Sequence, residues 1–169
     1  MASTYDNDLR LNEMATGDQS GTWGDTTNLN LRLIAEAFSY QADATFTTDA
    51  NTQVTIANGA TDKYRGMYIK VTSTVGGGLT ASRDLEVLPS TVSKVLFVEN
   101  STTGGQSIVV KQGSGASVTV PNGSCKLLFL DGAGTGLSLI HISEPTRPER
   151  ISDGLVWWKK KKGGGGGGG

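Results

Sequence analysis

The chain is organised around residues Thr16–Tyr40, which read TGDQSGTWGDTTNLNLRLIAEAFSY. The first part, Thr16–Asp25, holds three glycines and no branched aliphatic residue. It is therefore predicted to be a loop with positive φ at one or more glycines. Trp23 is the only large apolar side chain in it, and two interpretations stay open. The indole packs on the neighbouring helix as local core, or it docks at a protein interface, where Trp is enriched.

A helix is predicted to follow this loop. The segment Asp25–Asn28 offers several N-cap side chains in a row, and the apolar residues from Leu29 onward recur at helical spacing. One face carries Leu31, Ile34, Ala35 and Phe38, an adjoining stripe carries Leu29, Leu33 and Ala37, and the polar side carries Arg32, Glu36 and Ser39.

This apolar arc is wide for a helix of only about three turns, which is marginal alone in water. The helix is therefore expected to cover a β-sheet or to pack with copies of itself. The candidate assembly interface consists of the indole and the apolar helix residues: Trp23, Leu29, Leu31, Leu33, Ile34 and Phe38.

From Ala42 onward the hydrophobic pattern has period two and is broken by turns such as Asn58-Gly59. Many short strands at this spacing predict a mainly β fold: a short N-terminal helix followed by a small antiparallel β-sandwich or barrel-like domain. There is no strict repeat of 20–50 residues, so a solenoid is not predicted. The predicted strands are Ala44–Thr47, Gln53–Ala57, Gly66–Thr72, Leu79–Ala81, Asp84–Leu88, Lys94–Glu99, Ser107–Gln112, Ser117–Val120 and Cys125–Leu130.

Three of these strands carry a prediction about burial. Met67–Thr72 alternates apolar and polar residues, as in a half-buried strand. Val95–Val98 is continuously apolar, which predicts a central strand buried on both faces. In the last strand Cys125, Leu127 and Phe129 are predicted to point inward.

The last 33 residues differ in sequence character from residues 1–136, which we call the body. Leu137–Arg147 resembles the conceptual translation of a transposase-type sequencing adapter, Ile151-Ser152 resumes that adapter, and runs of four Lys and seven Gly follow. We therefore interpret 137–169 as a non-native, disordered read-through tail, with the natural gene cut near Gly136. His141, Trp157 and Trp158 then support no functional role.

Without that tail the body is acidic and offers little for catalysis. It keeps nine basic and 13 acidic residues, a net charge of −4, which argues against nucleic acid as a partner. Cys125 has no His in the body to activate it and is interpreted as a small buried residue. No clustered metal-ligand signature, secretory signal or membrane-length apolar run is present in this sequence, so no cofactor, metal or membrane insertion is predicted.

A set of short motifs carries a family resemblance over essentially all of 1–136. Met1–Tyr5, Leu9–Leu11, Ser20–Gly24, Thr27–Asn30 and Leu33–Ala37 together resemble the N-terminus of tailed-phage fibre or virion appendage proteins. Later segments are similar to the same family, and only the acidic strand Asp84–Val87 departs from it: Leu79–Arg83, Ser93–Asn100, Thr102–Gln106, Val118–Gly123 and Leu130–Gly132.

The resemblance implies a non-enzymatic virion protein that is made in the bacterial cytoplasm and contributes to attachment to the host surface. Its expected partners are copies of itself, often as a trimer, and other virion tail proteins, with host glycan bound through a distal region that is missing here. The expected organisation is an attachment or oligomerisation segment at 1–41, a β-rich domain at 42–136 and the tail at 137–169.

Two other classes of function stay open. A carbohydrate-binding β-sandwich would stack sugar rings on Tyr40, Phe46, Tyr64 or Tyr68. A hydrolase would need paired carboxylates, and Asp84 and Glu86 lie two apart on one predicted strand, so they share a face.

Overall fold

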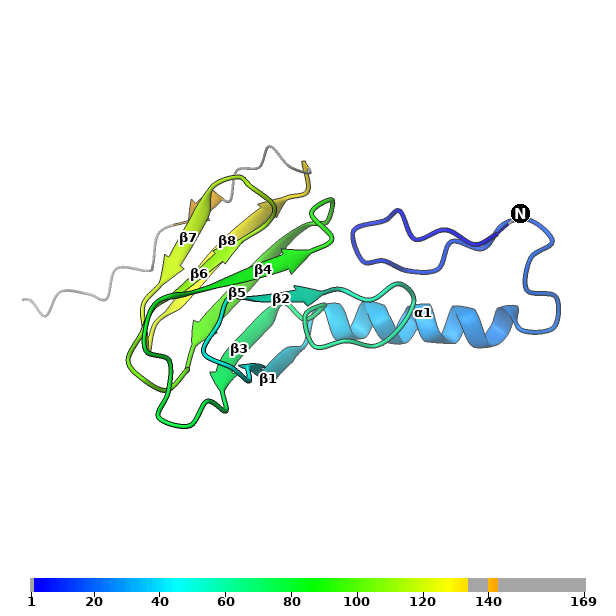
Figure 1. The fold of residues 1–169 in the computed structure, drawn as a ribbon. Helices are drawn as coiled ribbons and strands as arrows, with labels where there is room; N and C mark the ends of the chain where they lie inside the picture. The colour runs from blue at the N-terminus through cyan, green and yellow to red at the C-terminus, as the bar shows by residue number, and fades with distance from the viewer. Residues whose placement is uncertain (1, 134–139, 143–169) are drawn as a thin grey trace, which may run out of the picture.

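The computed structural model describes residues 2–133 and 140–142. Over these residues a single helix projects from a two-layered β-sandwich, and the N-terminal arm lies beside the helix (Figure 1). The elements are α1 (Trp23–Ala37), β1 (Tyr40–Phe46), β2 (Thr52–Thr55), β3 (Tyr68–Ser73), β4 (Arg83–Leu88), β5 (Ser93–Asn100), β6 (Ile108–Lys111), β7 (Ser117–Val120), β8 (Cys125–Asp131) and β9 (Ile140–Ile142).

The two layers are a five-stranded sheet of order β1-β3-β5-β8-β9 and a four-stranded sheet of order β2-β4-β6-β7. Their inner faces alternate with solvent-facing residues and meet in one hydrophobic core. Val71, Leu96 and Leu128 enter this core from one sheet, and Val110 and Val120 enter it from the other, all with less than 1% of their surface exposed. The prediction of a mainly β sandwich preceded by a short helix is confirmed.

The prediction that the strands are antiparallel is wrong for the first six. Successive strands alternate between the two sheets, so β1, β3 and β5 stack in parallel and β2, β4 and β6 do the same. Only the pairs β5–β8, β6–β7 and β8–β9 are antiparallel. Glycine turns set the local change of direction, but whether the next strand returns to the same sheet or crosses to the other depends on packing.

The burial of β5 and β8 also differs from the prediction. Leu96 and Val98 face the core, whereas Val95 is 40% exposed and Phe97 is half-buried. In β8 the core residues are Leu128 and Leu130, so the predicted inward set of Cys125, Leu127 and Phe129 lies on the outer face. Both strands carry apolar residues on the outer face, where Val95 is exposed and Phe97, Leu127 and Phe129 are half-buried. The alternation predicted for Met67–Thr72 is confirmed by the burial of Ile69 and Val71.

Residues Leu79–Ala81 form no strand but a turn that packs against another turn. The backbone N–H of Leu79 donates to the carbonyl of Thr103 at 2.9 Å. Gly78 and Gly104 both have positive φ and approach each other so closely that neither has room for a side chain. This contact joins the β3–β4 connection to the β5–β6 connection.

Helix α1 begins earlier than predicted. Trp23 is its first residue, so Asp25 lies in the first turn and the predicted N-cap segment Asp25–Asn28 is inside the helix. Thr22 occupies the N-cap position without a side-chain cap hydrogen bond. The preceding loop has positive φ at Gly17 and Gly21, as predicted.

The N-terminal arm is bonded both to the middle of the helix and to the long β2–β3 loop. Asn12 and Asn30 exchange two hydrogen bonds of 3.0 and 2.9 Å between the arm and α1. The arm also accepts a hydrogen bond from Gly59 N–H at the Arg10 carbonyl, at 2.8 Å. The loop is anchored in turn by the Lys94 ammonium, which donates to the carbonyls of residues 64, 65 and 66 at 2.6–3.2 Å.

One element lies within the segment predicted to be a non-native tail. Strand β9 pairs with β8 in antiparallel register, with Ile142 opposite Leu127 and Ile140 opposite Phe129. These three residues are the only part of that segment that the structure describes. The rest of that prediction falls on residues outside the described ranges.

Candidate assembly interface

Helix α1 leaves a row of large apolar side chains exposed. Trp23 is 65% exposed, Leu31 60%, Ile34 37% and Phe38 71%. With Thr27 between the first two, the spacings are four, four, three and four residues, which keeps the row on one face of an α-helix. We call these four apolar residues the helix seam. Steps of three and four residues are the spacing at which one helix packs along another.

The adjoining stripe of the helix is more buried than the seam. Leu33 is fully buried and Ala37 nearly so, while Leu29 is half-buried. Asn30, one turn before Leu33 on the same side, is the residue that bonds to the arm. Leu33 therefore belongs to the core of its own chain and is removed from the predicted interface. The sequence could not separate the two stripes, because covering one of them depends on where the arm lies.

A second apolar surface lies on the outer face of the five-stranded sheet. The register places Tyr40 beside Tyr68 and Tyr68 beside Phe97, with ring centroids 5.3 and 6.1 Å apart. Leu127 pairs with Phe97 and continues the row, and the next row pairs Val95 with Phe129. We call these six residues the sheet face. They are Tyr40, Tyr68, Val95, Phe97, Leu127 and Phe129.

Sequence reasoning missed the sheet face because Leu127 and Phe129 were predicted to point into the core and Val95 and Phe97 to lie in a strand covered on both faces. The available signal was the uninterrupted apolar run Val95–Val98. Such a run shows that both faces of a strand are to be covered, but it does not show whether the cover comes from the same chain.

The polar groups beside the sheet face are paired with one another. The Glu99 carboxylate accepts hydrogen bonds from Tyr68 at 2.9 Å and Ser101 at 2.6 Å, and it lies 3.2 Å from the Lys70 ammonium. The Ser101 hydrogen bond is the main reason that the pKa of Glu99 lies below its usual range. Burial raises the pKa of the neighbouring Cys125 thiol, so the neutral thiol is favoured.

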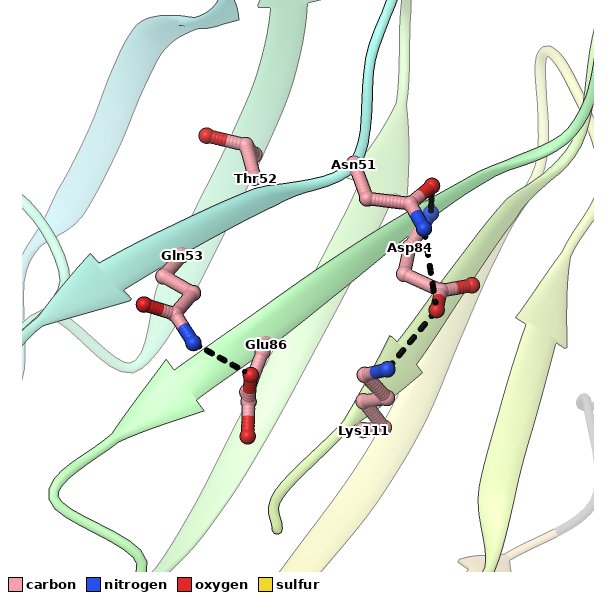
Figure 2. Close-up of a pocket in the computed structure, with 6 residues that line it drawn as sticks. All are labelled: Asn51, Thr52, Gln53, Asp84, Glu86 and Lys111. Atoms are coloured by element: carbon pink, nitrogen blue, oxygen red, sulfur yellow. Dashed lines mark hydrogen bonds and ion pairs between the residues drawn. The ribbon is translucent and has the colours of Figure 1, made fainter. Parts of the chain in front are cut away.

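The outer face of the four-stranded sheet is polar instead. It carries an open hollow of about 360 Å³ lined by the side chains labelled in Figure 2. Gln53 donates to Glu86 at 2.7 Å, and Lys111 donates to Asp84 at 2.7 Å, which raises the pKa of Lys111. Asp84 and Glu86 therefore share a face, as predicted from their spacing, and each has a polar partner.

The aromatic residues considered for sugar stacking do not line this hollow. Phe46 is in the core, and Tyr64 packs against the core with its hydroxyl bonded to Asp43. Tyr40 and Tyr68 lie on the outer face of the opposite sheet. The structure thus separates the aromatic surface from the polar hollow.

Neither a metal centre nor a membrane span is found in the described ranges. Among residues 2–133 and 140–142, no group of three or more His, Cys, Asp or Glu side chains is placed to hold a metal ion. Within the same residues, no helix is long and apolar enough to cross a membrane.

The fold and the two apolar surfaces define this chain as a mixed parallel and antiparallel β-sandwich with a projecting helix. Comparisons with protein-family models, with curated proteins and with solved structures found no match for this chain.

Proposed function

We propose that this protein is a non-enzymatic structural component of a bacteriophage tail fibre or virion appendage that contributes to host attachment. It assembles with copies of itself through the helix seam. The observation that carries the proposal is the seam on a projecting helix, with three of its four side chains at least 60% exposed. Large exposed apolar patches mark interaction sites. The resemblance of residues 1–136 to phage appendage proteins suggests that the assembly is part of a virion.

The interaction is expected to stabilise the helix as well as the assembly. The described structure shows few contacts between α1 and the sandwich, since only Leu33 and Ala37 of the helix are buried. A short helix with so little tertiary support is marginal. Burying the seam against other copies would supply the missing support and hold the β-domains in a fixed array, as an appendage requires. Other virion tail proteins would join this N-terminal part.

The test is the mass of the full 169-residue chain in solution, measured by light scattering after size exclusion. A closed oligomer is expected, and Leu31→Gln should weaken it at least tenfold. Arg32→Gln is the matched control, because Arg32 is an exposed neighbour that lies off the seam. A wild-type chain that stays strictly monomeric at tens of micromolar would overturn the proposal.

A carbohydrate-binding module is the second candidate, favoured by one observation. The hollow on the four-stranded sheet presents amide, carboxylate and ammonium groups, which are the groups that bind sugar hydroxyls. This candidate ranks second because the aromatic residues considered for sugar stacking do not line the hollow. A glycan array resolves the two: glycan binding that is lost in Glu86→Ala, by a chain that is monomeric, would favour this candidate.

A further inference from the structure

We infer that the sheet face belongs to the same interface as the helix seam, so that copies of this chain associate in parallel, helix against helix and sheet against sheet. This inference rests on the proposed self-assembly and specifies its partner surface and its orientation. The occupant of the sheet face is a second copy of the chain.

The first argument is continuity. Phe38 ends the helix seam and Tyr40 begins the sheet face only two residues later. Tyr40 is 58% exposed, and its ring lies 5.3 Å from that of Tyr68. The apolar surface therefore runs from the helix onto the sheet without a polar interval longer than Ser39.

The second argument is area. An aromatic side chain covers roughly 150–250 Å² when fully buried. At their exposures, the two aromatic side chains of the seam, Trp23 and Phe38, offer roughly 270 Å² between them, and Tyr40 of the sheet face adds roughly 115 Å². A stable protein interface buries about 800 Å² on each partner. The helix seam supplies only part of that area, and the sheet face is the adjoining apolar surface that can supply the rest.

The third argument is charge. The charged groups beside the sheet face, Lys70 and Glu99, already neutralise each other at 3.2 Å. At this pair a copy of the same face therefore meets no net charge, so the pair favours neither an acidic nor a basic partner. The four-stranded sheet, with Asp84, Glu86 and Lys111 on its outer face, offers no comparable apolar surface.

The fourth argument is orientation. Helix α1 projects from one end of the β-sandwich (Figure 1), so the seam extends along the helix away from the sheet face. Antiparallel copies would place a helix opposite a sheet, whereas parallel copies match like with like. Taking Leu31 and Phe38 as a positions makes Ile34 a d position. Leucine at a with isoleucine at d favours assemblies of more than two helices in parallel coiled coils.

The first experiment compares two lysine substitutions at outward positions of the two sheets. Val95→Lys places an ammonium in the sheet face, and Thr119→Lys does so on the exposed outer face of the other sheet. Sedimentation velocity of the full chain should show at least a tenfold weaker association for Val95→Lys and wild-type association for Thr119→Lys. Circular dichroism verifies that each variant is folded. Tyr40→Lys, on the edge strand β1, repeats the test if Val95→Lys unfolds.

The second experiment tests orientation by disulfide cross-linking. In a Cys125→Ser background, which removes the native thiol, Thr27→Cys and Ala35→Cys are oxidised separately, because these positions lie beside the seam and leave its four apolar side chains in place. The two positions are eight residues apart, about 12 Å along a helix. Parallel copies bring each position close to its own equivalent, so both variants should cross-link. An antiparallel pair could cross-link at most one of them.

The outcomes separate this inference from the proposed function. If Leu31→Gln dissociates the assembly while Val95→Lys and Tyr40→Lys are folded and associate normally, the sheet face is not an interface but the seam still is. If only one of the two cysteine positions cross-links, the parallel arrangement is wrong. If the wild-type chain is a monomer, both ideas fail.

Discussion

Gly104 and Gly105 offer a direct test of the contact between the two turns that join the sheets. Both have positive φ, 98° and 70°, so an alanine at either is placed in a conformation that costs roughly 1–2 kcal/mol. They differ in their surroundings. A Cβ on Gly104 would lie 2.2 Å from the Leu79 carbonyl oxygen and 2.5 Å from the Leu79 nitrogen, whereas nothing lies within 4 Å of a Cβ on Gly105.

The substitution Gly104→Ala must therefore push the two turns apart. The hydrogen bond from Leu79 N–H to the Thr103 carbonyl, 2.9 Å long, would be lost or distorted. Leaving such backbone groups unpaired costs about 1–3 kcal/mol in addition to the backbone strain. We expect Gly104→Ala to lower the free energy of unfolding by at least ~3 kcal/mol, and Gly105→Ala by only ~1–2 kcal/mol.

Urea denaturation at one fixed protein concentration measures both values, because association also shifts the apparent stability. Gly78→Ala serves as a replicate from the other side of the contact, since its Cβ would lie 2.5 Å from the Gly104 nitrogen. Equal losses of stability for Gly104→Ala and Gly105→Ala would refute the close approach of the turns.

Two further predictions concern Lys94 and Trp23. Burial lowers the pKa of Lys94 to about 8 from 10.5, so between those values the unfolded chain binds a proton that the folded chain does not. The free energy of unfolding should therefore rise with pH across this window, by at most ~3 kcal/mol, and Lys94→Met should flatten the rise. Urea denaturation at a series of pH values from 7 to 10.5 measures this dependence. Equal slopes of unfolding free energy against pH for the wild type and Lys94→Met would exclude the prediction. Trp23→Ala should abolish the oligomer and leave the β-domain folded, because the indole is 65% exposed in the single chain; global unfolding in circular dichroism would instead show that the indole packs as core.

Local sequence patterns were sufficient to predict the classes of local structure. Apolar residues at helical spacing predicted a helix after the Gly-rich loop, and α1 lies there, although it begins at Trp23 rather than after Asn28. Period-two patterns located eight of the strands to within a few residues, because alternation reports directly that a strand has two different faces. The exception is Leu79–Ala81, where Leu79 is buried by the packing of two turns rather than in a sheet, and Thr80 and Ala81 are exposed.

The tertiary structure decided which strands are neighbours and which apolar residues the chain itself covers. Turn chemistry is local, so it could not show that β1 to β6 alternate between sheets and stack in parallel. A hydrophobic pattern indicates that a face of an element is shielded from water, but it does not identify the segment or the partner chain that covers that face. Leu33 and Leu31 look equivalent in the sequence, yet one is fully buried and the other 60% exposed. The N-terminal arm bonds to the helix at Asn30, on the side of Leu33, whereas the described chain leaves the helix seam exposed.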